Sequence, residues 1–234
     1  MLNKNVSLGM EKIVIIGGST GIGNALAEIL SENFDVHCFH RSESTSNSNN
    51  ISHYPFDVLT DDFVDLGEIK SLVYCPGSIN LKPFSSLSLE QYKEDMEINV
   101  YGFVRALQFY KNKFQEGGSA IGFSTVATMQ GMPFHASVAV AKGALNGLVK
   151  TLAAEWAPKI RVNAIAPTLT DTPLASKLLR NERLIEKMKE RHPLKHIIDP
   201  TEIAGLCKFL ISDMARGISG QIIPVDSGIV SMKI

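Results

Sequence analysis

Residues 12–33 contain a short apolar run, a glycine-rich turn and a segment with helical periodicity, and this order constrains the fold more than any other feature. KIVII has no alternation of polar and apolar residues after its lysine, which is typical of a strand covered on both faces of a parallel sheet. GGSTGIG follows directly, and GIGNALAEILSEN then repeats apolar residues at helical spacing. A strand joined to a helix by glycines indicates the start of a βαβ crossover unit.

The same alternation continues to the end of the chain. Further strands are predicted at 36–40, 51–56, 71–75, 119–125, 160–167 and 221–225, and helices near 61–68, 87–114, 136–157, 172–190 and 200–212. The polar stretch between the second and third strands, 42–50, is expected to be a mobile loop. We therefore predict one α/β domain over 1–234: a Rossmann-like, doubly wound fold with about seven parallel strands and helices on both faces.

Composition removes several other classes of protein. The net charge of −1 gives no indication of a nucleic-acid or membrane-surface partner, and no apolar run approaches the length of a membrane-spanning helix. The N-terminal stretch lacks the apolar core of a signal peptide. Cys38, Cys75 and Cys207 form no CxxC pair, so we expect free thiols in a cytoplasmic protein and no metal site.

The glycine-rich turn is a candidate phosphate site. Gly17, Gly21 and Gly23 follow the spacing G-x3-G-x-G at the first strand–helix junction. Glycines permit a tight turn and a close approach of the backbone to a pyrophosphate, and the N-terminus of the following helix favours negative charge. Together with Ser19, Thr20 and Ile22, these glycines are the expected diphosphate-binding residues.

GGSTGIG resembles the cofactor turn of the short-chain dehydrogenase/reductase family, and further matches follow in the family's order over nearly the whole chain. The resemblance implies that Asp57 and Val58 of FDVLT line the adenine. It also implies that Asn99 of EINVYG belongs to the catalytic tetrad. Pro167 and Thr172, in RVNAIAP and DTPL, are implied to contact the cofactor, as are Cys75 and Gly77 in YCPG, where the family has N-N-A-G.

The end of the second strand indicates which dinucleotide is preferred. An acidic residue there would bind the ribose 2′-hydroxyl of NAD and repel the 2′-phosphate of NADP. This chain instead has His40, Arg41 and Ser42. A charge-assisted bond from Arg41 to the phosphate would contribute about 1.5–3 kcal/mol, so NADP is favoured and NAD remains the alternative.

The catalytic part of the family pattern is incomplete. Family members place a tyrosine four residues before the lysine, and the ammonium lowers the pKa of that tyrosine. If Lys142 is that lysine, which also binds the cofactor's ribose, the tyrosine position holds Val138 and the serine position holds Thr125. Threonine keeps a hydroxyl, but valine has no proton to transfer. The loss of a general acid typically costs about 10²–10⁴-fold in rate.

His135 is the candidate replacement. Enoyl-carrier-protein reductases, a divergent branch of the family, place their tyrosine seven residues before the lysine, and HASVAVAKGAL resembles their segment. Histidine titrates near neutral pH, which suits a proton donor. Seven helical residues span about 10.5 Å, however, so His135 would have to reach the substrate from the preceding loop. The alternative interpretation is a loop histidine at the rim of the pocket.

Two functions remain open. The first is an NADP(H)-dependent oxidoreductase acting on a carbonyl, alcohol or enoyl group, with Asn99, Thr125, Lys142 and His135 as candidate catalytic residues. The second is an inactive nucleotide-binding scaffold or regulatory subunit, which the valine at position 138 favours. The segment 168–198 is expected to line the pocket of a small-molecule substrate, and the family resemblance implies a homodimer or homotetramer.

Overall fold

Seven parallel strands form one sheet in the computed structural model of the chain, which describes residues 9–44, 46 and 48–233. Their order across the sheet is β3-β2-β1-β4-β5-β6-β7, and every neighbouring pair is parallel. The strands are β1 (Lys12–Ile16), β2 (Asp35–His40), β3 (Ile51–Pro55), β4 (Ile69–Tyr74), β5 (Phe114–Phe123), β6 (Ile160–Pro167) and β7 (Ile222–Val225). The direction of winding reverses between β1 and β4, which is where such folds bind ligands.

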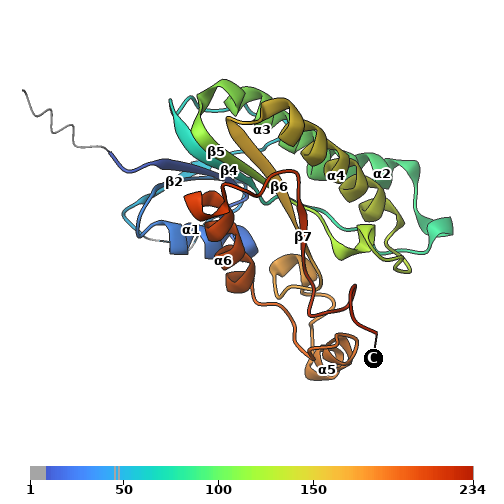
Figure 1. Cartoon of the computed structure of the whole chain (residues 1–234). Coiled ribbons are helices and arrows are strands. Elements are labelled where there is room, and N and C mark those ends of the chain that lie inside the picture. Colours follow the sequence, from blue (N-terminus) through green and yellow to red (C-terminus); the bar gives the residue numbers. More distant parts are fainter. Residues whose placement is uncertain (1–8, 45, 47, 234) are drawn as a thin grey trace, which may run out of the picture.

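Helices cover both faces of the sheet, as the sequence predicts (Figure 1). One face carries α1 (Gly21–Leu30) and α6 (Pro200–Ile211), and the other carries α2 (Leu89–Met96), α3 (Gly102–Tyr110) and α4 (Ala136–Trp156). A sixth helix, α5 (Glu182–Glu190), lies away from the sheet. Short 3₁₀ turns occur at Phe84–Ser86, Lys111–Lys113, Val126–Thr128, Pro173–Ala175 and Asp213–Ala215.

The two helical layers enclose two separate apolar cores. Successive side chains of β1 alternate between them: Ile13 and Ile15 pack with α1 and α6, whereas Val14 and Ile16 pack with α3 and α4. Because both faces are buried, these strands have the continuous apolar composition seen in the sequence. No helix of the described residues has the length and apolarity that spanning a membrane requires.

The helix predicted near 61–68 is wrong, because this segment is irregular. Side chains from elsewhere bind its backbone carbonyls: Lys12 Nζ donates to Leu66 O at 2.6 Å, and Tyr110 Oη donates to Val64 O at 3.0 Å. Phe63 and Leu66 also pack against the α3–α4 core. Tertiary contacts thus override the weak helical pattern.

Three other predicted elements differ from the structure by more than one or two residues at their ends. The long helix of 87–114 is divided into α2, a π-helical turn at Glu97–Tyr101 and α3. Strand β5 begins at Phe114 instead of 119, and the segment 172–190 is helical only in its 3₁₀ turn and α5. Residues 1–8, which bear on the signal-peptide prediction, and positions 45 and 47 of the polar loop lie outside the described residues.

Candidate active site

A hollow of about 270 Å³ lies at the carboxyl ends of β1, β2 and β4, at the point where the sheet reverses its winding. Every residue expected to bind the cofactor lines it except Lys142 and Pro167. These residues are Gly17, Ser19, Thr20, Gly21, Ile22, Gly23, Arg41, Ser42, Asp57, Val58, Cys75, Gly77 and Thr172. The hollow thus gathers segments that are far apart in the sequence.

The glycine turn has the geometry of a phosphate cradle. Gly17 and Gly21 have φ of 81° and 55°, a left-handed conformation that favours glycine. A Cβ at Gly23 would collide with the carbonyl oxygen of Gly17, so the turn can close only with glycine there. Thr20, the N-cap of α1, makes no side-chain capping bond. The first amides of α1 are therefore free to bind an anion, and the turn fits the diphosphate of a dinucleotide.

The end of β2 carries no acidic side chain into the hollow. His40 lines it, and burial lowers the pKa of His40, so the imidazole is neutral at pH 7. Arg41 is exposed and lies 3.7 Å from Asp57, while the hydroxyls of Ser42 and Ser19 are 2.9 Å apart. A cation and hydroxyl groups, with no carboxylate from β2, suit a phosphate at this end of the hollow.

Asn99 lies in the π-helical turn, which explains why its side chain is held inward. Gly102 N bonds to Glu97 O, five residues back, so the regular helical bonding is interrupted. Asn99 Nδ2 donates to Asp95 O at 2.8 Å and to Ser78 Oγ at 3.1 Å. The fully buried Asn99 amide therefore joins the distorted helix to the loop that follows β4.

Lys142 lies behind Gly77, at the inner end of the hollow. A Cβ built on Gly77 would be 3.9 Å from Lys142 Nζ and 3.4 Å from Asn99 Oδ1. Only 7% of Lys142 is exposed, and burial lowers the pKa of its ammonium to about 8. The nearby charge of Asp95 opposes that shift. Lys142 and Asn99 thus lie close together, as the family resemblance implies.

The positions expected to supply hydroxyl groups differ in character. Val138 lies on α4 one turn before Lys142 and is 4% exposed, so an aliphatic side chain fills this place. Thr125 follows β5, and its hydroxyl accepts a bond from Ala127 N at 3.3 Å. The adjacent Ser124 Oγ is buried and has no hydrogen-bond partner among the described residues. Thr125 itself is half-buried and is the N-cap of a 3₁₀ turn.

His135 is outside the cofactor hollow. It is the N-cap of α4, and its Nδ1 lies 2.7 Å from Pro133 O. A carbonyl can only accept, so Nδ1 carries a proton and Nε2 is the free acceptor in the neutral ring. Pro167 is also outside: it ends β6 beside Val225. Cys75 lines the hollow, but burial raises the pKa of its thiol well above the ordinary range, which makes it a poor nucleophile.

Sequence reasoning missed most of the apolar walls of this hollow, and only the 168–198 segment was expected to line a pocket. Most of the additional lining residues are apolar side chains from β2, the loop after β3, the π turn and the 168–198 segment: Phe39, Phe56, Leu59, Ile98, Pro173 and Leu174. Apolar residues at the ends of strands give no signal that separates a ligand wall from ordinary core. The only available signal was their position, directly beside residues that the resemblance did assign.

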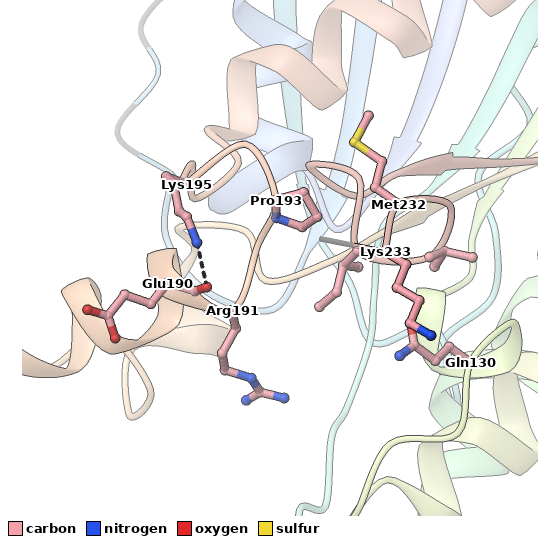
Figure 2. A pocket seen from close by; sticks show the side chains of 9 residues that line it. Gln130, Glu190, Arg191, Pro193, Lys195, Met232 and Lys233 are labelled. Carbon is pink, nitrogen blue, oxygen red and sulfur yellow. Dashed lines mark hydrogen bonds between the residues drawn. The ribbon is translucent and has the colours of Figure 1, made fainter.

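A second, wider hollow of about 690 Å³ lies between the segment after α5 and the C-terminal turn (Figure 2). Arg191, Lys195 and Lys233 line it, and Glu190 is its acidic residue. Lys195 Nζ donates to the backbone carbonyl of Glu190 at 2.9 Å, and the Glu190 carboxylate points away from Arg191 (Figure 2). The charged side chains of this lining are therefore mainly cationic.

The seven-stranded parallel sheet, with a hollow at its switch point, defines a doubly wound, Rossmann-like α/β protein, and the comparisons agree. Residues 56–230 match the family model described as "Enoyl-(Acyl carrier protein) reductase". A tropinone reductase homolog of Arabidopsis thaliana is 30% identical over 251 residues, covering 97% of this chain and 96% of the relative. An uncharacterised oxidoreductase of Mycobacterium tuberculosis is 32% identical over 240 residues, covering 92% and 95%.

A solved structure, the ligand-free aldohexose dehydrogenase of Thermoplasma acidophilum, superposes with a TM-score of 0.89 at 26% identity. The match covers 97% of this chain and 96% of that one. The chain therefore belongs to the short-chain dehydrogenase/reductase family, whose matched relatives carry the names of dehydrogenases and oxidoreductases.

Proposed function

We propose that this chain is an NADP(H)-dependent oxidoreductase that interconverts a carbonyl and an alcohol, or reduces an enoyl group, with a non-standard active site. The observation that supports this most directly is the hollow itself. It begins at the glycine turn and ends beside Gly77, directly in front of Lys142 and Asn99. A bound nicotinamide cofactor would supply the hydride.

The residues of the chain would bind and orient that cofactor. The turn from Gly17 to Gly23 and the start of α1 suit the diphosphate, and Asp57 and Val58 suit the adenine. The ammonium of Lys142 is suited to the hydroxyls of the nicotinamide ribose. Neutral His40 and exposed Arg41 support NADP as the preferred form, with NAD as the alternative.

A nucleotide-binding scaffold is the second candidate function, and Val138 is the observation that favours it. The buried Val138 side chain has no proton to transfer, and His135, which directly precedes α4, is outside the cofactor hollow. His135 remains a candidate proton donor if the loop before α4 closes over a substrate. The family model's description supports an enoyl substrate for such an arrangement.

Cofactor binding and turnover separate these functions. Titration with NADPH and NADH should give tighter binding of NADPH, and a panel of carbonyl and enoyl substrates should then show cofactor oxidation that Lys142→Ala abolishes. Binding without turnover on any substrate would favour the scaffold. Loss of NADPH binding altogether would contradict both.

Two further variants locate the proton donor. If the natural protein lacks carbonyl reduction and Val138→Tyr creates it, the valine is the cause of the missing activity. If His135→Ala leaves turnover unchanged, His135 is not the donor.

The proposed function also includes a homodimer or homotetramer as the assembly. It further includes a reducing cytoplasmic compartment, which the three free cysteines support.

A further inference from the structure

Asp95 is a buried carboxylate that the proposed function leaves unused. It lies on α2, one turn before Asn99, and none of its surface is exposed. Its Oδ1 accepts bonds from Ser78 Oγ at 2.5 Å and Asn80 Nδ2 at 3.2 Å. Its Oδ2 is equally buried but has no hydrogen-bond partner among the described residues. Burial of a carboxylate costs free energy unless its oxygens are paired, so the unpartnered Oδ2 needs an explanation.

Lys142 presents the complementary problem on α4, which packs against α2. Only 7% of the residue is exposed, yet among the described residues its Nζ forms no hydrogen bond and no ion pair within 4.0 Å. Ser78 connects the two groups: its backbone N–H donates to Asn99 Oδ1 at 3.4 Å, and Asn99 Oδ1 faces the same side of Gly77 as Lys142 Nζ. The Asp95 and Lys142 side chains therefore both lie against the Gly77–Ser78 segment of the loop after β4, and neither Asp95 Oδ2 nor Lys142 Nζ has a hydrogen-bond partner among the described residues.

We propose that Lys142 and Asp95 act as a charge pair, in which the Asp95 carboxylate keeps Lys142 protonated so that the ammonium is the proton donor of this site. The proposal rests on the proposed function, because the donor needs a substrate oxygen in the hollow. When a carbonyl accepts the hydride of the reduced nicotinamide, an N–H bond of Lys142 breaks and an O–H bond forms on the substrate. The neutral amine then recovers a proton from solvent.

The surroundings of Lys142 support this assignment. Burial lowers its pKa to about 8, which is close to the range where a general acid is most effective, whereas an ordinary lysine is too weak an acid. Asp95 raises the pKa, and without it the amine would lose its proton more readily. The remaining titratable group that acts on Lys142 is the Cys75 thiol, whose own raised pKa keeps it neutral. Val138 and the Thr125 hydroxyl offer no comparable acid.

Asp95 acts through Lys142 and is thus a positioning residue, so its test must read the protonation state of Lys142 directly. The protein is labelled with [ε-¹⁵N]lysine, and the Lys142 signal is assigned by its loss in Lys142→Met. Its pKa is then followed by NMR in the cofactor-free protein. Asp95→Asn keeps an acceptor for Ser78 but removes the charge. We expect the Lys142 pKa to fall by about one pH unit or more. Glu94→Gln, an exposed change on the same helix, should leave it unchanged.

Turnover gives the second measurement. In reduction, the alkaline limb of the kcat/KM profile should follow the Lys142 pKa and move to lower pH in Asp95→Asn. Lys142→Arg should still bind NADPH but lose turnover, because an arginine does not release its proton. An unchanged Lys142 pKa in Asp95→Asn, or an alkaline limb that does not move, would overturn the proposal.

Two further measurements separate a failure of this proposal from misfolding of a variant and from a failure of the proposed function. If Asp95→Asn does not fold, Asp95→Ser removes the same charge and leaves space for water at the bare position. The NMR titration needs neither cofactor nor substrate, so an absence of NADPH binding would contradict the proposed function while the charge pair is still measured. Loss of turnover in His135→Ala with an intact Lys142 titration would assign the proton to the histidine instead.

Discussion

Lys142 is largely buried, and its lowered pKa makes the stability of the protein depend on pH. The folded pKa of about 8 lies below the ordinary value of 10.5 that the unfolded chain regains. Between these values the unfolded state binds the proton and the folded state does not. Stability attributable to Lys142 must therefore rise with pH across this window.

The expected measurement compares the wild type with Lys142→Met from pH 7 to 10.5. The free energy of unfolding of the wild type, relative to that of the variant, should increase with pH above 8 by up to about 3 kcal/mol. Subtracting the variant matters, because raised pKa values of buried groups such as Tyr74 act in the opposite direction. A flat difference between the two proteins would contradict a lowered pKa.

At the residue scale, we propose that Arg41 determines the preference between the two dinucleotides. Its side chain is 72% exposed, so its pair with Asp57 adds little to stability and its removal should not unfold the protein. Arg41→Ala should weaken NADPH binding by about tenfold or more, through the loss of a charge-assisted bond, and leave NADH binding nearly unchanged. Isothermal titration with both cofactors measures this. Equal losses for the two would show that Arg41 does not contact the 2′-phosphate.

The residues that line the hollow were predictable individually, whereas the electrostatics around Lys142 were not. Gly17, Gly23 and Asp57 belong to short local motifs, so their neighbours in sequence reveal them. Asp95 and Lys142 come from different helices, and their proximity depends on how α2 packs on α4. No spacing in the sequence connects residues 95 and 142.

Among the elements, the turn between β1 and α1 is the least tolerant of change. Gly23→Ala would place a methyl group against the carbonyl oxygen of Gly17, and overpacking of this kind typically costs about 1–3 kcal/mol. We expect lower stability in urea unfolding together with weaker NADPH binding. Gly205→Ala is the matched control, because the position lies in α6 with open space around it. That change should stabilise the protein by up to about 1 kcal/mol.

The π-helical turn shows where element prediction fails. Apolar spacing correctly predicts that residues of 87–114 are mostly helical, but periodicity carries no information about one extra residue in a turn. The distortion is stabilised by tertiary and side-chain bonds, in particular the one from Asn99 to Asp95 O. The irregular 61–68 segment has a similar cause, since Lys12 and Tyr110 bind its carbonyls from a distance.

At the scale of the whole molecule, the alternation of strands and helices determined the fold class before any residue was assigned. The remaining question is assembly. The outer side of α4 exposes small and aliphatic residues, Val140, Gly143, Ala144 and Gly147, which allow close approach of a second helix. This surface supports the proposed homodimer.

Light scattering tests that proposal. The wild type should have the mass of a dimer or tetramer, and Ala144→Glu, which introduces a charge on this surface, should shift it toward the monomer. Lys187→Glu on α5 is an equally exposed change away from α4 and should not alter the mass. A monomeric wild type, or a dimer unaffected by Ala144→Glu, would place any interface elsewhere.

The extra residue in the Glu97–Tyr101 turn also has a consequence for how this sequence can evolve. The turn absorbs one residue more than a regular turn, because Gly102 N bonds to the fifth residue back instead of the fourth. Deleting one residue there would restore a regular helix and leave α2 and α3 in nearly the same phase. Phe103, Leu107 and Tyr110 of α3 would then keep their places against the sheet. The deletion would displace the Asn99 side chain instead, so the irregular turn is required by the site and not by the core.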